Sequence, residues 1–100
     1  MSYKKTMEGV KYLVQNELDM ASEENGERFH SGHEAYAVIK EEIEEMQCEC
    51  EIEGYWLIDM WAKVTHDSNY GHELSMLENT AIKCACEAIQ VAAMARKAMR

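Results

Sequence analysis

The 100-residue sequence contains no proline and five glycines, so few of its residues interrupt a helix. It has no apolar run long enough to cross a bilayer, and its N-terminal segment lacks the apolar centre of a signal peptide. Positive charge is scarce: ten Lys and Arg against nineteen Asp and Glu give a formal net charge of −9. These absences argue against a membrane or nucleic-acid partner and predict a cytoplasmic protein that favours cationic ligands.

What the sequence has in quantity is helix-forming residues. Apolar residues make up 47% of the chain, which is enough for one globular domain spanning residues 1–100. Frequent Ala, Glu, Met and Lys indicate an all-α fold. A chain of this length buries a modest core, so we expect it to self-associate.

Apolar periodicity predicts four helices, at about residues 2–24, 31–53, 55–64 and 73–99. Asn25 and Gly26 suit the C-terminal end of the first helix. Gly54 is expected to end the second helix and to separate it from the short apolar segment 55–64. Periodicity alone does not exclude a strand in that short segment. Residues 67–71 contain a cluster of turn formers.

The second predicted helix carries a carboxylate on its apolar face. Ser31 and Glu34 form a capping-box signature that places the start of the helix. Glu42 then falls on the same stripe as the apolar residues Ala35, Val38, Ile39 and Met46. A carboxylate in a packed interior costs several kcal/mol unless it is neutralised. Glu42 is therefore expected to be protonated or to bind a metal ion.

The last predicted helix repeats the anomaly at Glu87, whose neighbours at helical spacing are largely apolar. If the second and last helices are antiparallel neighbours, Glu42, Glu45 and Glu87 face one interior. Carboxylate oxygens suit Mg²⁺, with Mn²⁺ possible. The alternative is that Glu42 extends to solvent from a helix boundary and Glu87 pairs with Lys83.

Two segments resemble a known family. The sequence EEIEE at 41–45 matches the EExxE motif of the MazG-like all-α nucleoside triphosphate pyrophosphohydrolases, and FHSGHEAYAVIKEEIEEM and EAIQVAAMA look like its phage and bacterial branch. The resemblance implies a helical bundle completed by homodimerisation, and Mg²⁺-dependent cleavage of a nucleoside triphosphate to monophosphate and pyrophosphate. It further implies Glu42 and Glu45 as metal ligands, Glu41 as a nearby ligand or a supporting carboxylate, and all three as catalytic residues. Glu87 matches the first residue of an ExxD motif.

The fourth position of that ExxD motif is Gln90 in place of aspartate. Its amide oxygen can still reach a metal, but the lost charge should weaken Mg²⁺ binding, and activity is expected to be lower or absent. Asp59 is a candidate for the missing charge, or else an ordinary solvent-facing residue.

Several basic and aromatic residues are candidates for substrate binding. Lys83, Arg96 and Lys97 are candidates for the outer phosphates, or else they complement the dipole of the last helix. Trp56 and Trp61 are candidates for stacking on a base, and core packing is the alternative. The paired motifs Cys48/Cys50 and Cys84/Cys86 do not suit zinc, because residues two apart on a helix diverge by about 200°. We expect reduced, core-filling thiols.

Three functions therefore remain open from the sequence. The first is a Mg²⁺-dependent nucleotide pyrophosphohydrolase. The second is a catalytically weak or inactive helical protein that binds metal or nucleotide, and the third is a purely structural helical dimer.

Overall fold

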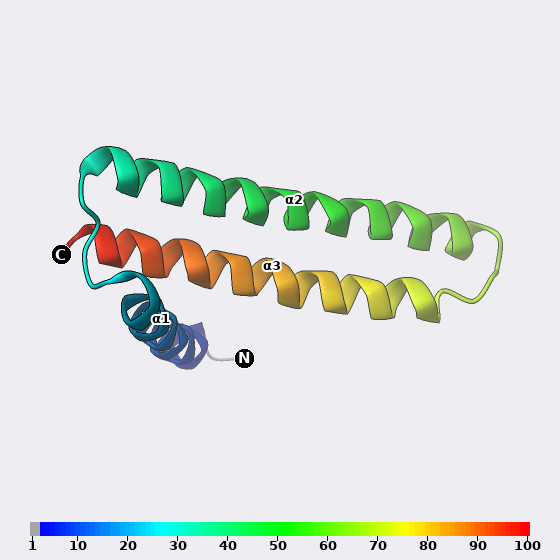
Figure 1. The fold of residues 1–100 in the computed structure, drawn as a ribbon. Coiled ribbons are helices and arrows are strands. Elements are labelled where there is room, and N and C mark those ends of the chain that lie inside the picture. Colours follow the sequence, from blue (N-terminus) through cyan, green and yellow to red (C-terminus); the bar gives the residue numbers. More distant parts are fainter. Residues whose placement is uncertain (1–2) are drawn as a thin grey trace.

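A computed structural model describes residues 3–100 of the chain as three helices, with no strand in that range. They are α1 (Tyr3–Asn25), α2 (Gly32–Thr65) and α3 (Gly71–Ala98), shown in Figure 1. The predicted all-α class is confirmed. Among the described helices, none combines the length and the apolar character that a membrane crossing requires.

Local signals in the sequence set the ends of the first two helices. Gly26 follows α1 with a φ of 87°, a left-handed conformation that glycine adopts without steric cost. The Ser31 hydroxyl accepts a hydrogen bond from the Glu34 N–H and caps α2. The Glu34 carboxylate bonds to the backbone N–H and the ring of His30, and not to the N–H of Ser31 as in a standard capping box.

The predicted break at Gly54 is wrong. Helix α2 runs through Gly54 without interruption, so the segment 55–64 is its C-terminal part. The described chain therefore has three helices where four were expected. A glycine inside a helix costs only about 1 kcal/mol relative to alanine. Packing of α2 along α3 offsets that cost.

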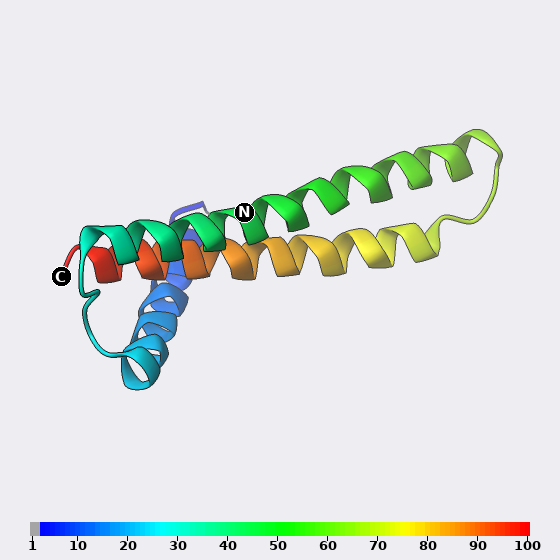
Figure 2. The same ribbon diagram turned by 45° about the horizontal axis from the view of Figure 1, so that its top comes forward.

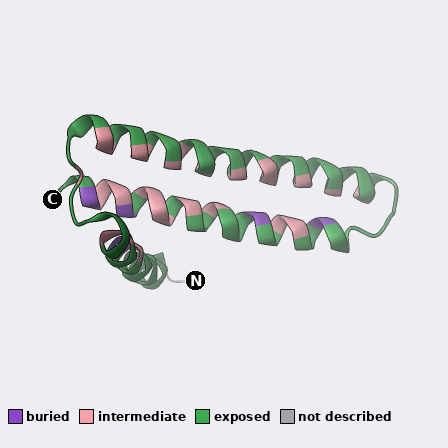
Figure 3. Ribbon diagram, viewed as in Figure 1, coloured by how far each residue is buried: buried purple, intermediate pink, exposed green. Residues whose placement is uncertain are grey.

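Helices α2 and α3 form a long antiparallel hairpin, and α1 packs across the C-terminal half of α3 (Figures 1 and 2). The buried core lies at that junction and consists of Val14, Leu18 and Ala93, with Ile89 and Met94 packed beside them. Figure 3 shows how few positions are fully buried. On α1, Val14 and Leu18 are buried, whereas the apolar residues Val10 and Leu13 are exposed.

The other half of the hairpin projects beyond α1 and carries much of its apolar surface in the open. The molecule measures 55 × 30 × 20 Å, with a radius of gyration of 17.2 Å, against about 13 Å for a compact domain of this size. Near the tip, Lys63 lies 3.6 Å from the buried carboxylate of Glu73. Exposed apolar side chains on this projecting half are Tyr55, Leu57, Ile58, Trp61, Leu74 and Ile82.

Two of the four cysteines cross-link the hairpin. Cys50 on α2 and Cys84 on α3 form a disulfide with their Cα atoms 5.7 Å apart. Cys48 and Cys86 are free and exposed, so the expectation of four reduced, core-filling thiols is wrong in this structure. The cross-link fixes the register of α2 against α3 close to the acidic residues of both helices.

Candidate metal centre

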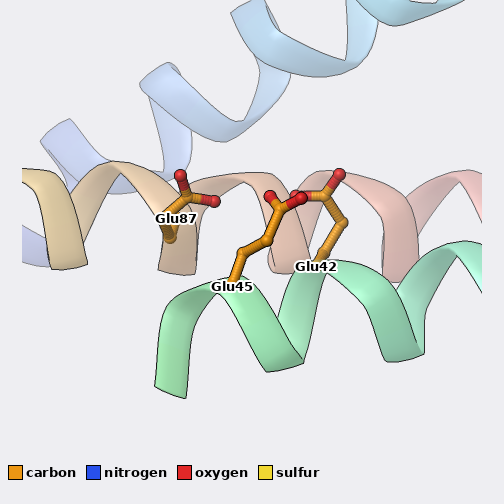
Figure 4. Close-up of side chains that lie close together, drawn as sticks. All are labelled: Glu42, Glu45 and Glu87. Carbon is orange, nitrogen blue, oxygen red and sulfur yellow. The ribbon is translucent and has the colours of Figure 1, made fainter. Parts of the chain in front are cut away.

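Three glutamates from the two hairpin helices converge on one point. One carboxylate oxygen from each of Glu42, Glu45 and Glu87 lies within 4.8 Å of the others. Figure 4 shows Glu42 and Glu45 reaching across from α2, while Glu87 extends from the facing turn of α3. The expectation that these side chains meet is confirmed, although Glu45 is exposed and only Glu42 and Glu87 are partly buried.

Helix geometry explains why these residues meet. Glu42 and Glu45 are three residues apart, so they lie one above the other on the face of α2 that packs on α3. The apolar residues predicted to share this stripe with Glu42 are all partly buried: Ala35, Val38, Ile39 and Met46. Glu42 lies ten residues inside α2, which excludes the alternative that it extends to solvent from a helix end.

The electrostatic environment of the cluster opposes ionisation. Burial raises the pKa of Glu42, and the charges of Glu45 and Glu87 raise it further. Burial, followed by the charge of Glu45, likewise raises the pKa of Glu87. Lys83 forms no ion pair with Glu87 in the described chain, so that alternative is not met either.

Two carboxylate oxygens in the cluster lack a hydrogen-bond partner within the described chain. They are Oε2 of Glu42 and Oε2 of Glu87, and both atoms are buried. Leaving such an acceptor unsatisfied costs about 1–3 kcal/mol, and more when it is charged. A hard divalent cation with oxygen ligands fits this donor set, because it would satisfy both atoms and offset the mutual repulsion.

Gln90 and a residue of α1 border the same region. A hollow of about 300 Å³ beside the cluster is lined by Glu42 and Gln90 together with Glu17. The charge of Glu17 also contributes to the raised pKa of Glu42. Glu17 is not one of the residues singled out from the sequence. Its spacing of three residues from the buried Val14 is the signal that it flanks the interior.

The remaining acidic candidates lie outside the convergent group. Glu41 is exposed and is not one of the three converging residues, although its charge contributes to the raised pKa of Glu42. Asp59 is exposed and lies fourteen residues beyond Glu45 on the same helix, which is about 21 Å along the axis. Asp59 therefore cannot supply the charge that Gln90 lacks.

The candidate substrate-binding residues are dispersed. Lys83 is exposed and makes no hydrogen bond or ion pair within residues 3–100, while Arg96 donates to the side chain of Gln15 at 3.1 Å. The Lys97 ammonium lies 4.6 Å from the centre of the Phe29 ring. Trp56 is half-buried and meets His72 edge to face at 5.7 Å. The structure does not gather these four around the acidic cluster.

Neither Trp61 nor the cysteines have the core-packing role expected of them. Trp61 is 67% exposed, so it does not have the core-packing role. Each CxC motif has one member in the disulfide and one exposed thiol, an arrangement that fits the argument against a four-thiolate zinc site. Comparisons of the chain with protein-family models, with curated proteins and with solved structures gave no match.

Proposed function

We propose that this protein is a Mg²⁺-dependent nucleoside triphosphate pyrophosphohydrolase. It would cleave (d)NTP to (d)NMP and pyrophosphate. The observation that carries the proposal is the convergence of Glu42, Glu45 and Glu87, two of which hold buried oxygens without a partner. The resemblance of EEIEE to the EExxE motif supplies the reaction class.

The roles of the residues follow from their positions. Bound at this cluster, Mg²⁺ would polarise phosphate oxygens and lower the pKa of a coordinated water. Glu42 and Glu87 would hold the ion from the buried side, and the exposed Glu45 would face the substrate. Glu41 would contribute negative charge from the adjacent position on α2. Gln90 would offer its neutral amide oxygen from the neighbouring hollow.

The second candidate is a weak or inactive protein that binds metal or nucleotide without turnover. Gln90 favours it, because an amide at this position adds no charge to the ligand set and cannot accept a proton as a general base. The two candidates share one site and differ in whether the bound substrate reacts.

Pyrophosphate release from a panel of NTPs and dNTPs, with Mg²⁺ and with a chelator, tests the enzymatic proposal. We expect slow release that requires Mg²⁺, and faster release by Gln90→Asp, since the restored carboxylate should bind the ion about tenfold more tightly. Gln90→Glu is the matched control, because it restores the charge on a longer side chain. Absence of Mg²⁺-dependent release from both wild-type and Gln90→Asp protein would leave the binding function in its place.

We also propose that the chain forms a homodimer through the projecting half of the α2–α3 hairpin. The described chain exposes 7445 Å². A compact monomer of 11.5 kDa exposes only about 5,800 Å². The difference between these two areas is larger than the roughly 800 Å² that each partner contributes to a standard interface. A second hairpin packed on this half would turn two helices into four and cover apolar side chains such as Leu57, Ile58 and Trp61.

The double substitution Ile58→Glu/Trp61→Glu should convert the dimer to a monomer. Both side chains are more than half exposed in the single chain, so the change places two carboxylates in the proposed interface without disturbing the monomer fold. Analytical ultracentrifugation measures the mass, and circular dichroism checks that helix content is kept. Ser68→Glu, in the turn at the same end, is the control. A wild-type protein that sediments as a monomer at all concentrations contradicts the dimer.

A further inference from the structure

A second hollow is lined by basic residues, in contrast to the acidic cluster. It has a volume of about 320 Å³ and sits where the start of α2 meets the end of α3. Figures 1 and 2 both place the C-terminal end of the chain beside the start of α2. Three of its lining residues are the cations Arg28, Lys97 and Arg100, and none is acidic. In a protein of net charge −9, a cavity lined by three cations is unexpected.

Lys97 is the unusual member of this group, because its side chain is buried without a hydrogen-bond acceptor. The residue is only 4% exposed. Its ammonium lies over the Phe29 ring at 4.6 Å and makes no hydrogen bond or ion pair within the described chain. The nearby carboxylate of Glu34 is already engaged by His30. The Lys97 ammonium keeps some access to solvent, and its charge also acts on the Glu34 carboxylate, whose pKa it helps to lower. With no hydrogen bond of its own, it is free to donate to an anion that enters the hollow.

The first turn of α2 adds backbone N–H donors to the cationic side chains. Ser31 is the N-cap, and its hydroxyl is used by the N–H of Glu34. The N–H groups of Gly32 and His33 belong to the first helical turn and have no acceptor within the described chain. Together with the positive end of the helix dipole, such free N–H groups favour an anion. Ser31 and Gly32 both line the hollow.

The two arginines flank the buried lysine in different ways. Arg100 is oriented by hydrogen bonds from Nη1 to the Ser22 hydroxyl and to the backbone oxygen of Glu27. Arg28 is exposed and makes no hydrogen bond or ion pair within residues 3–100, so its guanidinium is free to close over a ligand. One arginine guanidinium can bind two phosphate oxygens at once, so both arginines are suited to hold a phosphate group.

We propose that this hollow is a binding site for a phosphate group, held by Lys97, Arg28 and Arg100 and by the first N–H groups of α2. It is separate from the acidic cluster, because Gly32 precedes Glu42 by ten residues, or about 15 Å along the helix. The site needs no divalent metal and does not depend on the proposed hydrolase activity. The phosphate can be free inorganic phosphate or the phosphoryl group of a nucleotide.

Binding is tested by titrating metal-free protein in the presence of a chelator, so that the acidic cluster holds no cation. Inorganic phosphate and a nucleoside monophosphate are the two probes. The amide signals of Gly32 and His33 in a ¹⁵N correlation spectrum should shift with saturation in the millimolar range or below. Tighter binding of the nucleotide identifies a phosphorylated organic ligand, and equal or tighter binding of inorganic phosphate identifies the free ion.

Two variants test the residues. Lys97→Met keeps the length of the side chain and its packing on Phe29, and Arg28→Ala alters an exposed residue that cannot disturb the fold. Each should weaken phosphate binding about tenfold, as loss of a charge-assisted contact predicts. Lys11→Ala, which removes the same charge from an exposed position on α1, should bind like wild type. Unshifted amides at Gly32 and His33, or wild-type affinity in Arg28→Ala, would overturn the site.

Discussion

Glu42→Gln is expected to abolish the thermal stabilisation that Mg²⁺ or Mn²⁺ gives the native protein. A ligand that binds only the native state, present at 100 times its Kd, raises the free energy of unfolding by about 2.7 kcal/mol. Glu42 supplies one of the two buried carboxylate oxygens that have no partner in the cluster, and glutamine has no charge to offer a cation there. Differential scanning calorimetry with and without the metal measures the loss.

The matched control for this substitution is Glu51→Gln on the same helix. Glu51 is exposed and makes no hydrogen bond or ion pair among the described residues, so the control removes the same charge without touching the cluster. It should keep the full metal-linked shift. If Glu42→Gln keeps that shift too, Glu42 is not a ligand.

Without metal, Glu42→Gln should stabilise the protein at neutral pH. Burial raises the pKa of Glu42, so the native state holds its proton more tightly than the unfolded chain does. The contribution of this carboxyl to stability is therefore fully present in acid and is lost as the pH rises through its native pKa. Glutamine is neutral at every pH. The free energy of unfolding of the variant, relative to that of wild type, should therefore increase as the pH rises. Urea unfolding of both proteins across the acidic range, with a chelator present, measures the difference.

Leu18→Ala should cost about 2–5 kcal/mol of stability, the usual range for emptying a fully buried leucine position. Leu18 is 1% exposed and belongs to the small cluster that holds α1 on α3. In a domain with so few buried side chains, that loss is a large share of the total free energy of unfolding. We expect a lower urea midpoint and faster proteolysis within α1.

Leu13→Ala on the same helix provides the control for Leu18→Ala. Leu13 is 48% exposed, so its truncation removes less buried surface and leaves a smaller cavity. Equal urea midpoints for the two variants would mean that α1 does not rely on the observed core.

Structural features that depend on short-range interactions were predictable from the sequence. The cap at Ser31 and the left-handed Gly26 follow from short-range chemistry, and both are found where expected. The convergence of Glu42, Glu45 and Glu87 was also predictable, because helical periodicity fixes which side of each helix a residue occupies. Only the antiparallel packing of α2 and α3 had to be assumed.

The features that sequence analysis missed depend on packing between distant elements. Gly54 was expected to end a helix, but the pairing of α2 with α3 overrides its weak local preference. The pairing of Cys50 with Cys84 requires the register between two helices, which neither CxC motif encodes. The packing of the Lys97 ammonium over the Phe29 ring depends on the path of the connection after α1.

A crystal structure of the protein grown with Mn²⁺ tests the metal centre most directly, because anomalous scattering locates the ion without reference to the protein coordinates. We predict one strong anomalous peak at coordination distance from carboxylate oxygens of Glu42, Glu45 and Glu87. Fully occupied manganese elsewhere, with these three side chains unligated or turned apart, would contradict the metal centre and the function proposed from it.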